Sequence, residues 1–569
     1  MSVGSRAAGR DAGAAPWHLL LLVAFVAGVA LRLWQLDIQI LIDDEWHAIH
    51  RLLRAGPVDI LTHLGYADYS IPLTLYYQWL YRTIGLSEWA MHLPPLVAGV
   101  ALLLIGPRML SRWAGLPARA TWLALAALSP LLVYHSKVAR PYALTSLLTF
   151  VAIVAFRAWW LEGRRRDAAI YAVATFFAGW LHSLTLPFTL LPFLYCFAQV
   201  LLGRAPALPA TASAADRPAG QRNAQMRRLI VLGAATALPL ASALAPPIVI
   251  DWSQLAAKAA RDTITPGSVV RTALMLVGTG SPSAGILIWT AAGIGFVSLR
   301  RRDADLARYL ATIAGGGTAV IASSGAEWIF HPLVLARYLI PIVPFVLLCL
   351  AEGIVAVIGW LRRPRIEAGI AGAAATGLLL AGPIPVEWHY PNQFWGHLRY
   401  QFDYDPAHNP YTRYMRDDPV PAFYRELAKL PPGSVTLIEA PWRLESHFNP
   451  QSLYQDVHRQ LIKIGLTTPV CGVRDFGEYP EELTGMRMRE FVHLTSILRG
   501  DATAADYLVL HLTPGETSTD PGTLWPDISP CLPAIAARLG TPVYRDEQIV
   551  VYKLAGLSPL GNTRRPVQQ

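Results

Sequence analysis

Three consecutive carboxylates, Asp43, Asp44 and Glu45, follow the first strongly apolar segment of the chain. That segment, residues 17–36, is about 20 residues long and almost free of charge, which is the length that crosses a bilayer as a helix. The acids are therefore expected at a membrane surface. Because ionised side chains are costly to keep near hydrocarbon, a cluster at that depth indicates a functional site.

The acidic cluster has two interpretations. If the chain becomes helical after Asp43, residues three and four positions apart share a face, so Asp43 lies near Trp46 and His47, and Asp44 lies near His47. A carboxylate beside a partly apolar interface can have a raised pKa, which suits a general base. The alternative is an acidic first turn that the helix dipole favours. The spacing alone leaves both interpretations open.

Cations at two later junctions could bind a phosphate. Lys137 and Arg140 lie in the stretch 134–142, which joins two apolar segments. Arg337 precedes another apolar segment, beside the interfacial aromatic Tyr338. A guanidinium can hold a phosphate through two parallel hydrogen bonds. The alternative is that these cations only reach the lipid headgroups.

Histidines near these groups are weaker candidates. His182 falls in a short turn between two apolar segments, where a satisfied polar residue of a helix bundle is the commoner role. No spacing of histidine, cysteine and acidic residues matches a zinc site, so no dedicated metal site is predicted.

The composition is that of an integral membrane protein. Apolar residues make up 53% of the 569 residues and charged residues only 15%, which is too apolar for a soluble protein of this size. The net charge of +9 does not indicate nucleic-acid binding, because the basic residues form short clusters between apolar runs. The length allows a membrane domain, residues 1–386, and a soluble domain, residues 387–569.

About 11 apolar segments are expected to cross the membrane by their length and hydropathy. They are residues 17–36, 89–106, 119–135, 141–161, 168–183, 186–203, 229–250, 284–299, 306–323, 338–360 and 366–386. The arginine clusters between them then all fall on one side, at 108–119, 164–166, 204–228, 300–302 and 362–365. The positive-inside rule makes that side the cytoplasm, which also holds the N-terminus and leaves the C-terminal domain outside.

Two segments require a choice. Residues 71–84 are apolar and aromatic but too short for a span, so a helix lying in the interface is expected there. A crossing at 71–84 would move every later basic loop to the other side. Arg6 and Arg10 before the first span resemble a signal peptide, but the apolar run is longer than a usual signal core, and an uncleaved helix is expected.

The region 387–569 is richer in proline, tyrosine, histidine and charge. Its patterns predict a small α/β domain, with strands near 434–439, 505–512 and 548–554 and helices near 452–465 and 531–539. Cys471 and Cys531 could pair there if the domain faces an oxidising compartment, and the sequence leaves this open. Cys196 and Cys349 are expected to pack as small apolar residues in the membrane domain.

Taken in order, these motifs resemble membrane glycosyltransferases of the GT-C class. The resemblance rests on Asp44-Glu45 after the first span, on the segment 71–77 followed by 87–95, and on the Ala-Arg-Pro-Tyr motif at 139–142. The nearest branches are those related to protein O-mannosyltransferases and to the lipid A aminoarabinose transferase. The match covers roughly residues 17–205, with Arg337-Tyr338 as a later echo.

The resemblance implies a polytopic all-α membrane domain, GT-C-like with about 11 transmembrane helices, and an extracytoplasmic C-terminal α/β domain, in a bacterial inner membrane. In that class the donor is a sugar on a polyprenyl phosphate and the active site faces the periplasm or its equivalent. The acidic pair of the class falls on Asp44-Glu45, with Asp43 as an extra neighbour. The usual His-Pro-Pro-Leu-Tyr stretch reads Ser-Ile-Pro-Leu-Thr-Leu-Tyr from residue 70, so acceptor contacts of that region are not carried over.

The implied reaction moves the sugar to an acceptor hydroxyl with inversion at the anomeric carbon. Asp44 would take the proton of the attacking hydroxyl. Arg140, Lys137 and Arg337 would stabilise the departing lipid phosphate. Weaker candidates for sugar or acceptor contacts are His47, Asp68, Tyr142, His182 and Tyr338.

The expected partners are a polyprenyl-phosphate sugar donor, membrane lipids and a glycan, lipid or protein acceptor, without nucleic acid. No cofactor is firmly implied, and a divalent metal held by Asp44 or Glu45 stays open. The alternative function is a transporter or flippase of lipid-linked sugars, which should carry its ionisable residues near the bilayer midplane in broken helices. An anchor for a sensory domain would not need so many spans.

Overall fold

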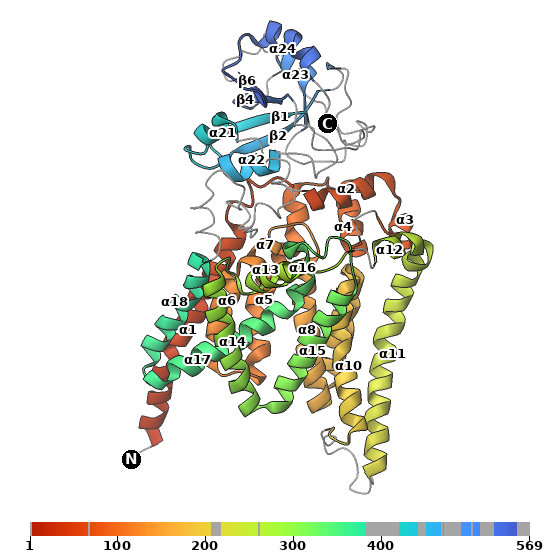
Figure 1. Cartoon of the computed structure of the whole chain (residues 1–569), viewed down its shortest axis with the longest axis vertical. Helices are drawn as coiled ribbons and strands as arrows, with labels where there is room; N and C mark the ends of the chain where they lie inside the picture. Colours follow the sequence, from red (N-terminus) through yellow and green to blue (C-terminus); the bar gives the residue numbers. More distant parts are fainter. Residues whose placement is uncertain are drawn as a thin grey trace.

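The computed structural model has a bundle of long helices with a smaller α/β domain at one end, and the N-terminus lies at the other end (Figure 1). The structure describes residues 3–41, 43–65, 69–205, 218–259, 262–381, 420–441, 451–467, 470–471, 491–501, 504–512 and 528–554. All statements below concern these residues.

Seven helical segments in the described part are long and apolar enough to cross a membrane. They lie in α1 (Val3–Leu33), α5 (Glu88–Met109), α8 (Tyr142–Glu162), α10 (Leu186–Leu201), α11 (Pro218–Ile250), α14 (Pro282–Arg302), and the run formed by α16 (Pro332–Leu339) and α17 (Val343–Ile358). Each coincides with a span expected from the sequence.

Four further stretches of helix fall on the remaining expected spans. They are α6 (Leu116–Leu128) with α7 (Pro130–His135), α9 (Arg165–Leu181), α15 (Ala304–Ser323) and α18 (Pro364–Ala381). These are shorter or less apolar than the seven. The polytopic helical fold is therefore confirmed, whereas a count of about 11 crossings stays a prediction. One apolar helix, α13 (Pro266–Val277), lies where the sequence predicted a loop.

Ion pairs connect helix ends at the end of the bundle that also carries the N-terminus. Arg157 near the end of α8 donates to Asp303 (2.9 Å) and Asp305 (3.3 Å), which lie at the turn between α14 and α15. Arg302 in that turn pairs with Glu352 of α17 at 2.8 Å. The arginine-rich turns thus share one face of the molecule, opposite the C-terminal domain (Figure 1), as the charge pattern predicts.

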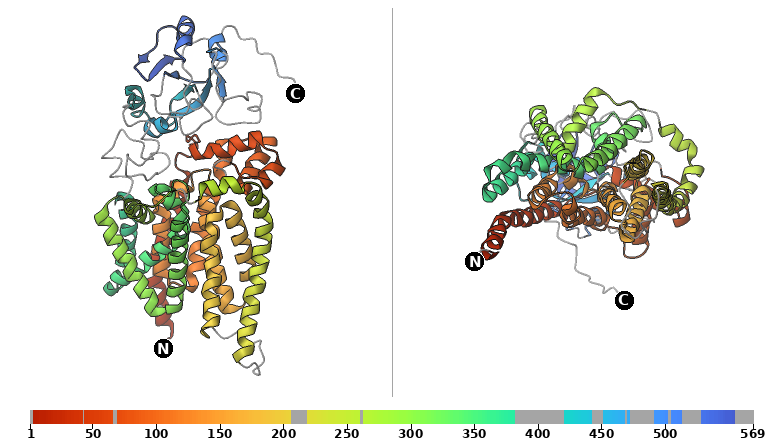
Figure 2. Two further views of the ribbon diagram at one scale, coloured as in Figure 1. Left: turned by 45° about the vertical axis from the view of Figure 1, so that its right-hand side comes forward. Right: turned by 90° about the horizontal axis from the view of Figure 1, so that it is seen from below.

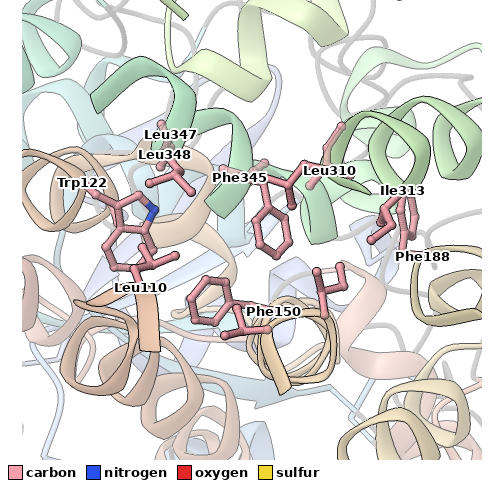
Figure 3. Close-up of a cluster of buried hydrophobic side chains, with 14 of the residues drawn as sticks. Leu110, Trp122, Phe150, Phe188, Leu310, Ile313, Phe345, Leu347 and Leu348 are labelled. Atoms are coloured by element: carbon pink, nitrogen blue, oxygen red, sulfur yellow. The ribbon is translucent and has the colours of Figure 1, made fainter. Parts of the chain in front are cut away.

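Aromatic side chains hold the centre of the bundle together (Figure 3). Phe150 of α8 lies between Trp122 of α6 and Phe345 of α17, with ring centroids 5.8 Å and 5.5 Å away. The indole nitrogen of Trp122 donates to the Pro344 carbonyl at 2.7 Å, which satisfies a buried polar group. Helix α17 is therefore fixed at this level to α6 and α8, which lie far earlier in the sequence.

Four short helices form a layer between the bundle and the C-terminal domain (Figures 1 and 2). They are α2 (Asp43–Arg54), α3 (Pro57–Thr62), α4 (Ile71–Arg82) and α12 (Trp252–Lys258). The stretch expected as an interfacial helix is α4, and its 12 residues keep it outside the set of long apolar helices. Its Tyr77 hydroxyl donates to the Ala139 carbonyl at 3.2 Å, which anchors the layer to the bundle.

A six-stranded sheet forms the C-terminal domain, in the order β3-β2-β1-β4-β6-β5. The strands are β1 (Thr436–Ala440), β2 (Leu461–Leu466), β3 (Phe491–His493), β4 (Tyr507–His511), β5 (Tyr544–Arg545) and β6 (Ile549–Lys553). The first four strands are mutually parallel, and β6 runs antiparallel to β4 and β5. The helices are α21 (Ala422–Leu427), α22 (Gln451–His458), α23 (Leu494–Arg499) and α24 (Leu532–Leu539).

The prediction of one helix over 452–465 is wrong in its second half. The helix α22 ends at His458, and β2 begins at Leu461. Arg459 adopts a left-handed conformation with φ of 57°, which stops the helix, and the residues that follow pair with β1 instead. The other strands and the helix that the sequence predicted coincide with β1, β4, β6 and α24.

The four cysteines behave as two pairs of different kinds. Cys471 and Cys531 form a disulfide that closes a sequence separation of 60 residues, so the pairing that the sequence left open is present. Cys196 and Cys349 are free thiols within the helical bundle, as expected.

A buried polar cluster lies between the sheet and α21–α22. The Glu439 carboxylate accepts from the Tyr424 hydroxyl at 2.9 Å and lies 2.6 Å from His511 Nε2. His458 stacks on Tyr424, and its Nδ1 accepts from the Gln460 backbone N–H at 2.9 Å. Burial lowers the pKa of His458 to about 3, so its imidazole is neutral in the folded domain at neutral pH.

This burial makes the stability of the C-terminal domain depend on pH. Since the unfolded imidazole titrates near 6.5, the contribution of His458 is complete above that pH and is lost as the pH falls toward 3. Acidification from pH 6.5 to about 5 should remove about 2 kcal/mol of unfolding free energy. Hydrogen exchange of β1 and β4 in the purified full-length protein measures this loss.

His458→Asn is the matched variant, because its side-chain oxygen can accept from the Gln460 N–H without titrating. The variant should lose less stability on acidification than the wild type. An equal pH dependence in the two proteins would show that His458 is not the group responsible.

Candidate functional site

Proline and glycine residues shape the turn that carries the cations. Pro130 ends α6 and begins α7, since proline has no backbone donor and suits a first helical position. Pro141 caps the start of α8. At Gly99 of α5, a Cβ atom would lie 2.1 Å from Ser136 Oγ, so only glycine lets α5 approach this turn. Residues 136–141 are thereby held against α1 and α5.

Glu45 is the best-described carboxylate of the acidic cluster. The helix α2 begins at Asp43, so all three acids occupy its first turn, where the helix dipole favours negative charge. The Glu45 side chain is fully buried. Its Oε1 accepts from the Ala139 backbone N–H at 2.5 Å and lies 2.8 Å from His92 Nε2. The acidic turn is therefore joined directly to the turn that contains Arg140.

His92 and Gln39 belong to this site and were not predicted. Gln39 Nε2 donates to the Lys137 carbonyl at 2.6 Å and lies 3.5 Å from His92 Nε2. Both side chains are completely buried. The spacing of Glu88 and His92, four residues apart in an otherwise apolar helix, is the one signal in the sequence that could have indicated a polar face there.

Arg337 lies beside the two aromatic rings next to His182, which lies between α9 and the short turn Ser183–Thr185. The Arg337 guanidinium is 5.4 Å from the ring centroids of both Tyr142 and Tyr338, and the His182 ring lies 5.5 Å and 5.6 Å from the same two rings. The Arg337 guanidinium makes the local potential positive, which favours an anion.

The carboxylate and the guanidiniums lie at the same end of the bundle. Glu45 is bonded to the amide of Ala139, the residue before Arg140, and Arg337 lies over the ring of Tyr142, two residues after Arg140. Segments more than 150 residues apart in the chain therefore lie together in this part of the structure. Their roles in a reaction remain predictions.

The sequence predicts Lys137 as a phosphate contact, whereas its surroundings in the structure indicate that it stabilises the fold. It is fully buried and its Nζ donates to the Trp34 carbonyl at 2.7 Å, at the end of α1. Arg32, the charged residue within the first span, is also fully buried, and it donates to Ser136 Oγ (3.2 Å) and to the Ala127 carbonyl (3.1 Å). Both cations fasten α1 to the 134–142 turn.

The remaining predicted site residues are distributed as follows. His47 is buried on α2, Tyr142 is buried at the start of α8, and Tyr338 is partly exposed on α16. The side chains of Asp43 and Asp44, and the whole of Asp68, lie outside the described residues. Within the described residues, no three histidine, cysteine or acidic side chains are grouped closely enough to hold a metal ion.

No protein-family model and no curated protein matches the sequence. Among solved structures, ArnT from Cupriavidus metallidurans in the apo state aligns over 96% of this chain and 98% of its own, at 15% identity and a TM-score of 0.45. The same protein bound to undecaprenyl phosphate aligns over 95% and 98%, at 15% identity and a TM-score of 0.42. The archaeal oligosaccharyltransferase AglB from Archaeoglobus fulgidus, in complex with an inhibitory peptide and a dolichol-phosphate, aligns over 87% of this chain and 69% of its own, at 13% identity and a TM-score of 0.41.

These neighbours are only 13–15% identical to this chain over the aligned residues. At TM-scores of 0.41–0.45 they describe only a general similarity. We therefore base the functional proposal on the geometry of the site itself.

The contact between His92 and Glu45 should contribute measurably to stability. In His92→Leu, the buried carboxylate loses one hydrogen-bond partner, which should cost about 1–3 kcal/mol of unfolding free energy. His92→Gln keeps a donor close to the position of the imidazole Nε2 and should cost less. Thermal unfolding of the two purified variants checks this order, and equal losses would mean that the hydrogen bond is not the source of the stability.

Proposed function

We propose that this chain is an integral-membrane glycosyltransferase that moves a sugar from a polyprenyl-phosphate donor to an acceptor hydroxyl. The observation that carries the proposal is the position of Arg337 over the ring of Tyr142, two residues after Arg140, next to the turn whose Ala139 amide binds Glu45. A buried carboxylate and two cations at one end of an apolar bundle suit a reaction between a lipid phosphate and a hydroxyl.

The membrane location simplifies capture of the donor. A polyprenyl tail stays in the bilayer and brings its phosphate to headgroup depth, which is where the short outer helices cap the bundle. Arg337 is fixed over two aromatic rings, so its guanidinium is positioned before the phosphate arrives. Pre-positioned charge is what makes electrostatic stabilisation effective in catalysis.

In the proposed reaction, Asp44 accepts the proton of the acceptor hydroxyl. The hydroxyl oxygen forms a bond to the anomeric carbon while the bond from that carbon to the phosphate oxygen breaks, and the carbon is inverted. The polyprenyl phosphate leaves with added negative charge, which Arg140 and Arg337 stabilise more strongly in the transition state than in the ground state. Lys137, which is buried in the same turn as Arg140, adds positive charge to this region.

Glu45 positions the acidic turn in this proposal. Its two close contacts hold it to α5 and to the 136–141 turn, while its neighbour Asp44 lies one residue earlier in the same first helical turn. Whether a divalent metal assists through Asp44 is a separate question, which activity measurements with and without chelator address.

The distribution of ion pairs favours an enzyme over a transporter of lipid-linked sugars. In the described part of the chain, the pairs of Arg157 and Arg302 lie near one end of the bundle and the pair of Glu45 lies at the other. A transporter of this type should carry its ionisable groups near the midplane, in broken helices.

The proposed orientation places the site and the C-terminal domain outside the cytoplasm, in a bacterial inner membrane. The shared face of the basic turns supports this orientation through the positive-inside rule. The disulfide between Cys471 and Cys531 also supports it, because disulfides persist in oxidising compartments. The acceptor is then a glycan, lipid or protein of the cell envelope.

Asp44→Asn should reduce transfer by about 10²–10⁴-fold, because the amide cannot take the proton. The measurement uses purified protein, radiolabelled polyprenyl-phosphate sugars and extracted envelope acceptors. Asp59→Asn is the control, since Asp59 is an exposed acid on α3 with 62% of its side chain accessible. Equal transfer by wild type and Asp44→Asn removes Asp44 from the mechanism. Movement of the lipid-linked sugar across vesicles without any transfer would support the transporter.

Arg337→Gln should lower kcat/KM for the donor by about 10²-fold, because one cation facing the leaving phosphate is lost. Arg337→Lys keeps the charge but not the paired hydrogen bonds, so an intermediate loss is expected. Arg82→Gln, an exposed arginine in the last turn of α4, serves as control. Similar activities of Arg337→Gln and Arg82→Gln would exclude Arg337 from the phosphate site.

A further inference from the structure

The side chain of Gln455 links the C-terminal domain to the segment that leads into α2. It is completely buried in α22. Its Oε1 accepts from the Ile40 backbone N–H at 2.9 Å, and its Nε2 donates to the Ile38 carbonyl at 2.7 Å and to the Gln460 carbonyl at 3.1 Å. Ile40 and Gln455 are 415 residues apart in the sequence.

The geometry of these contacts specifies one orientation of the amide. The oxygen faces an N–H donor and the nitrogen faces two carbonyl acceptors, so exchanging the two atoms would leave every contact mismatched. The amide bonds the carbonyl of one residue and the N–H of the second residue after it, much as a neighbouring strand would. Because Gln455 and Ile40 are both buried, losing the hydrogen bond between them would destabilise the folded protein.

Gln39, between the two bonded residues, extends the connection to the candidate site. Its side chain donates to the Lys137 carbonyl at 2.6 Å and lies 3.5 Å from His92, which in turn lies 2.8 Å from Glu45. The segment held by Gln455 thus also holds the groups that surround the buried carboxylate.

Apolar contacts reinforce the same connection. Ile462, Ile464 and Leu466 of β2 belong to one buried cluster with residues that precede and form α2, among them Ile40 and Trp46. The faces of a parallel sheet must be covered. Helices α21 and α22 pack on the same face over β1, β4 and β6, whereas a cluster that includes residues of α2 and of the segment before it covers β2. The helix that begins with the acids therefore shares a buried cluster with the sheet.

We infer that the C-terminal domain is a positioning element for the acidic turn, and that Gln455 is its positioning residue. The inference rests on the proposed glycosyltransferase function. Gln455 acts through the 38–40 backbone and Gln39, and it sets where the first turn of α2 lies relative to Arg140. If this turn were loose, Arg140 and Arg337 would still bind the phosphate of the donor. The proton acceptor Asp44 would, however, be misplaced.

Gln455→Met tests the inference, because methionine keeps the side-chain length and removes the hydrogen bonds. Gln460→Met is the matched control. Gln460 is also completely buried, and its side chain bonds the backbone of Val435, Leu427 and Pro431, all within the C-terminal domain. Both variants lose the same chemistry in the same domain, but only Gln455→Met loses the contact with the segment before α2.

Two readouts on the purified full-length variants decide the outcome. Hydrogen exchange in peptides covering residues 36–46 should become about tenfold faster or more in Gln455→Met and should change little in Gln460→Met. The kcat of sugar transfer should fall about 10–100-fold in Gln455→Met with the donor KM nearly unchanged, because misplacing a reacting group affects the chemical step.

The inference is overturned if exchange at 36–46 is unchanged in Gln455→Met, if Gln460→Met has the same effect on exchange and kcat, or if exchange rises while kcat stays at the wild-type value. Failure of the proposed function looks different. In that case the wild type transfers no sugar from any polyprenyl-phosphate donor, and the exchange measurement alone decides whether the domain holds the acidic turn.

Discussion

The hydrogen bond between Glu45 and the Ala139 backbone amide is the contact on which the arrangement of the outer end depends. It connects a helix that follows the first span to a turn that joins two later spans, and it does so away from water. A buried carboxylate is tolerated only where such partners exist. His92 and the Ala139 amide supply them, and this fixes the acidic turn beside Arg140.

Two buried cations also hold the 134–142 turn in place. Arg32 and Lys137 use their charge on backbone carbonyls at the ends of helices, where the macrodipole and the unsatisfied carbonyls attract a positive group. These two side chains stabilise the scaffold, while Arg337 lies over the rings of Tyr142 and Tyr338.

Sequence reasoning predicted the apolar segments that form the long helices and the common face of the basic turns, because each follows from hydropathy or charge bias. It missed His92 and Gln39, since their importance comes only from the contact with Glu45 across the fold. It also missed Arg32, because a single charge in an apolar run does not change the expectation of a helix. In the C-terminal domain, the sequence pattern predicts helix where β2 lies, because the left-handed conformation of Arg459 cannot be read from the hydrophobic pattern.

The contact between Gln455 and the segment before α2 has a consequence for the order in which the protein is made. Translation proceeds from the N-terminus, so Ile40 leaves the ribosome 415 residues before Gln455, its eventual partner. During that interval the helical bundle can insert into the bilayer while the first outer segment still lacks part of its surroundings. Maturation of this end of the molecule is therefore a late event in biosynthesis, and a chain cut short before α22 would be a membrane-inserted but immature protein.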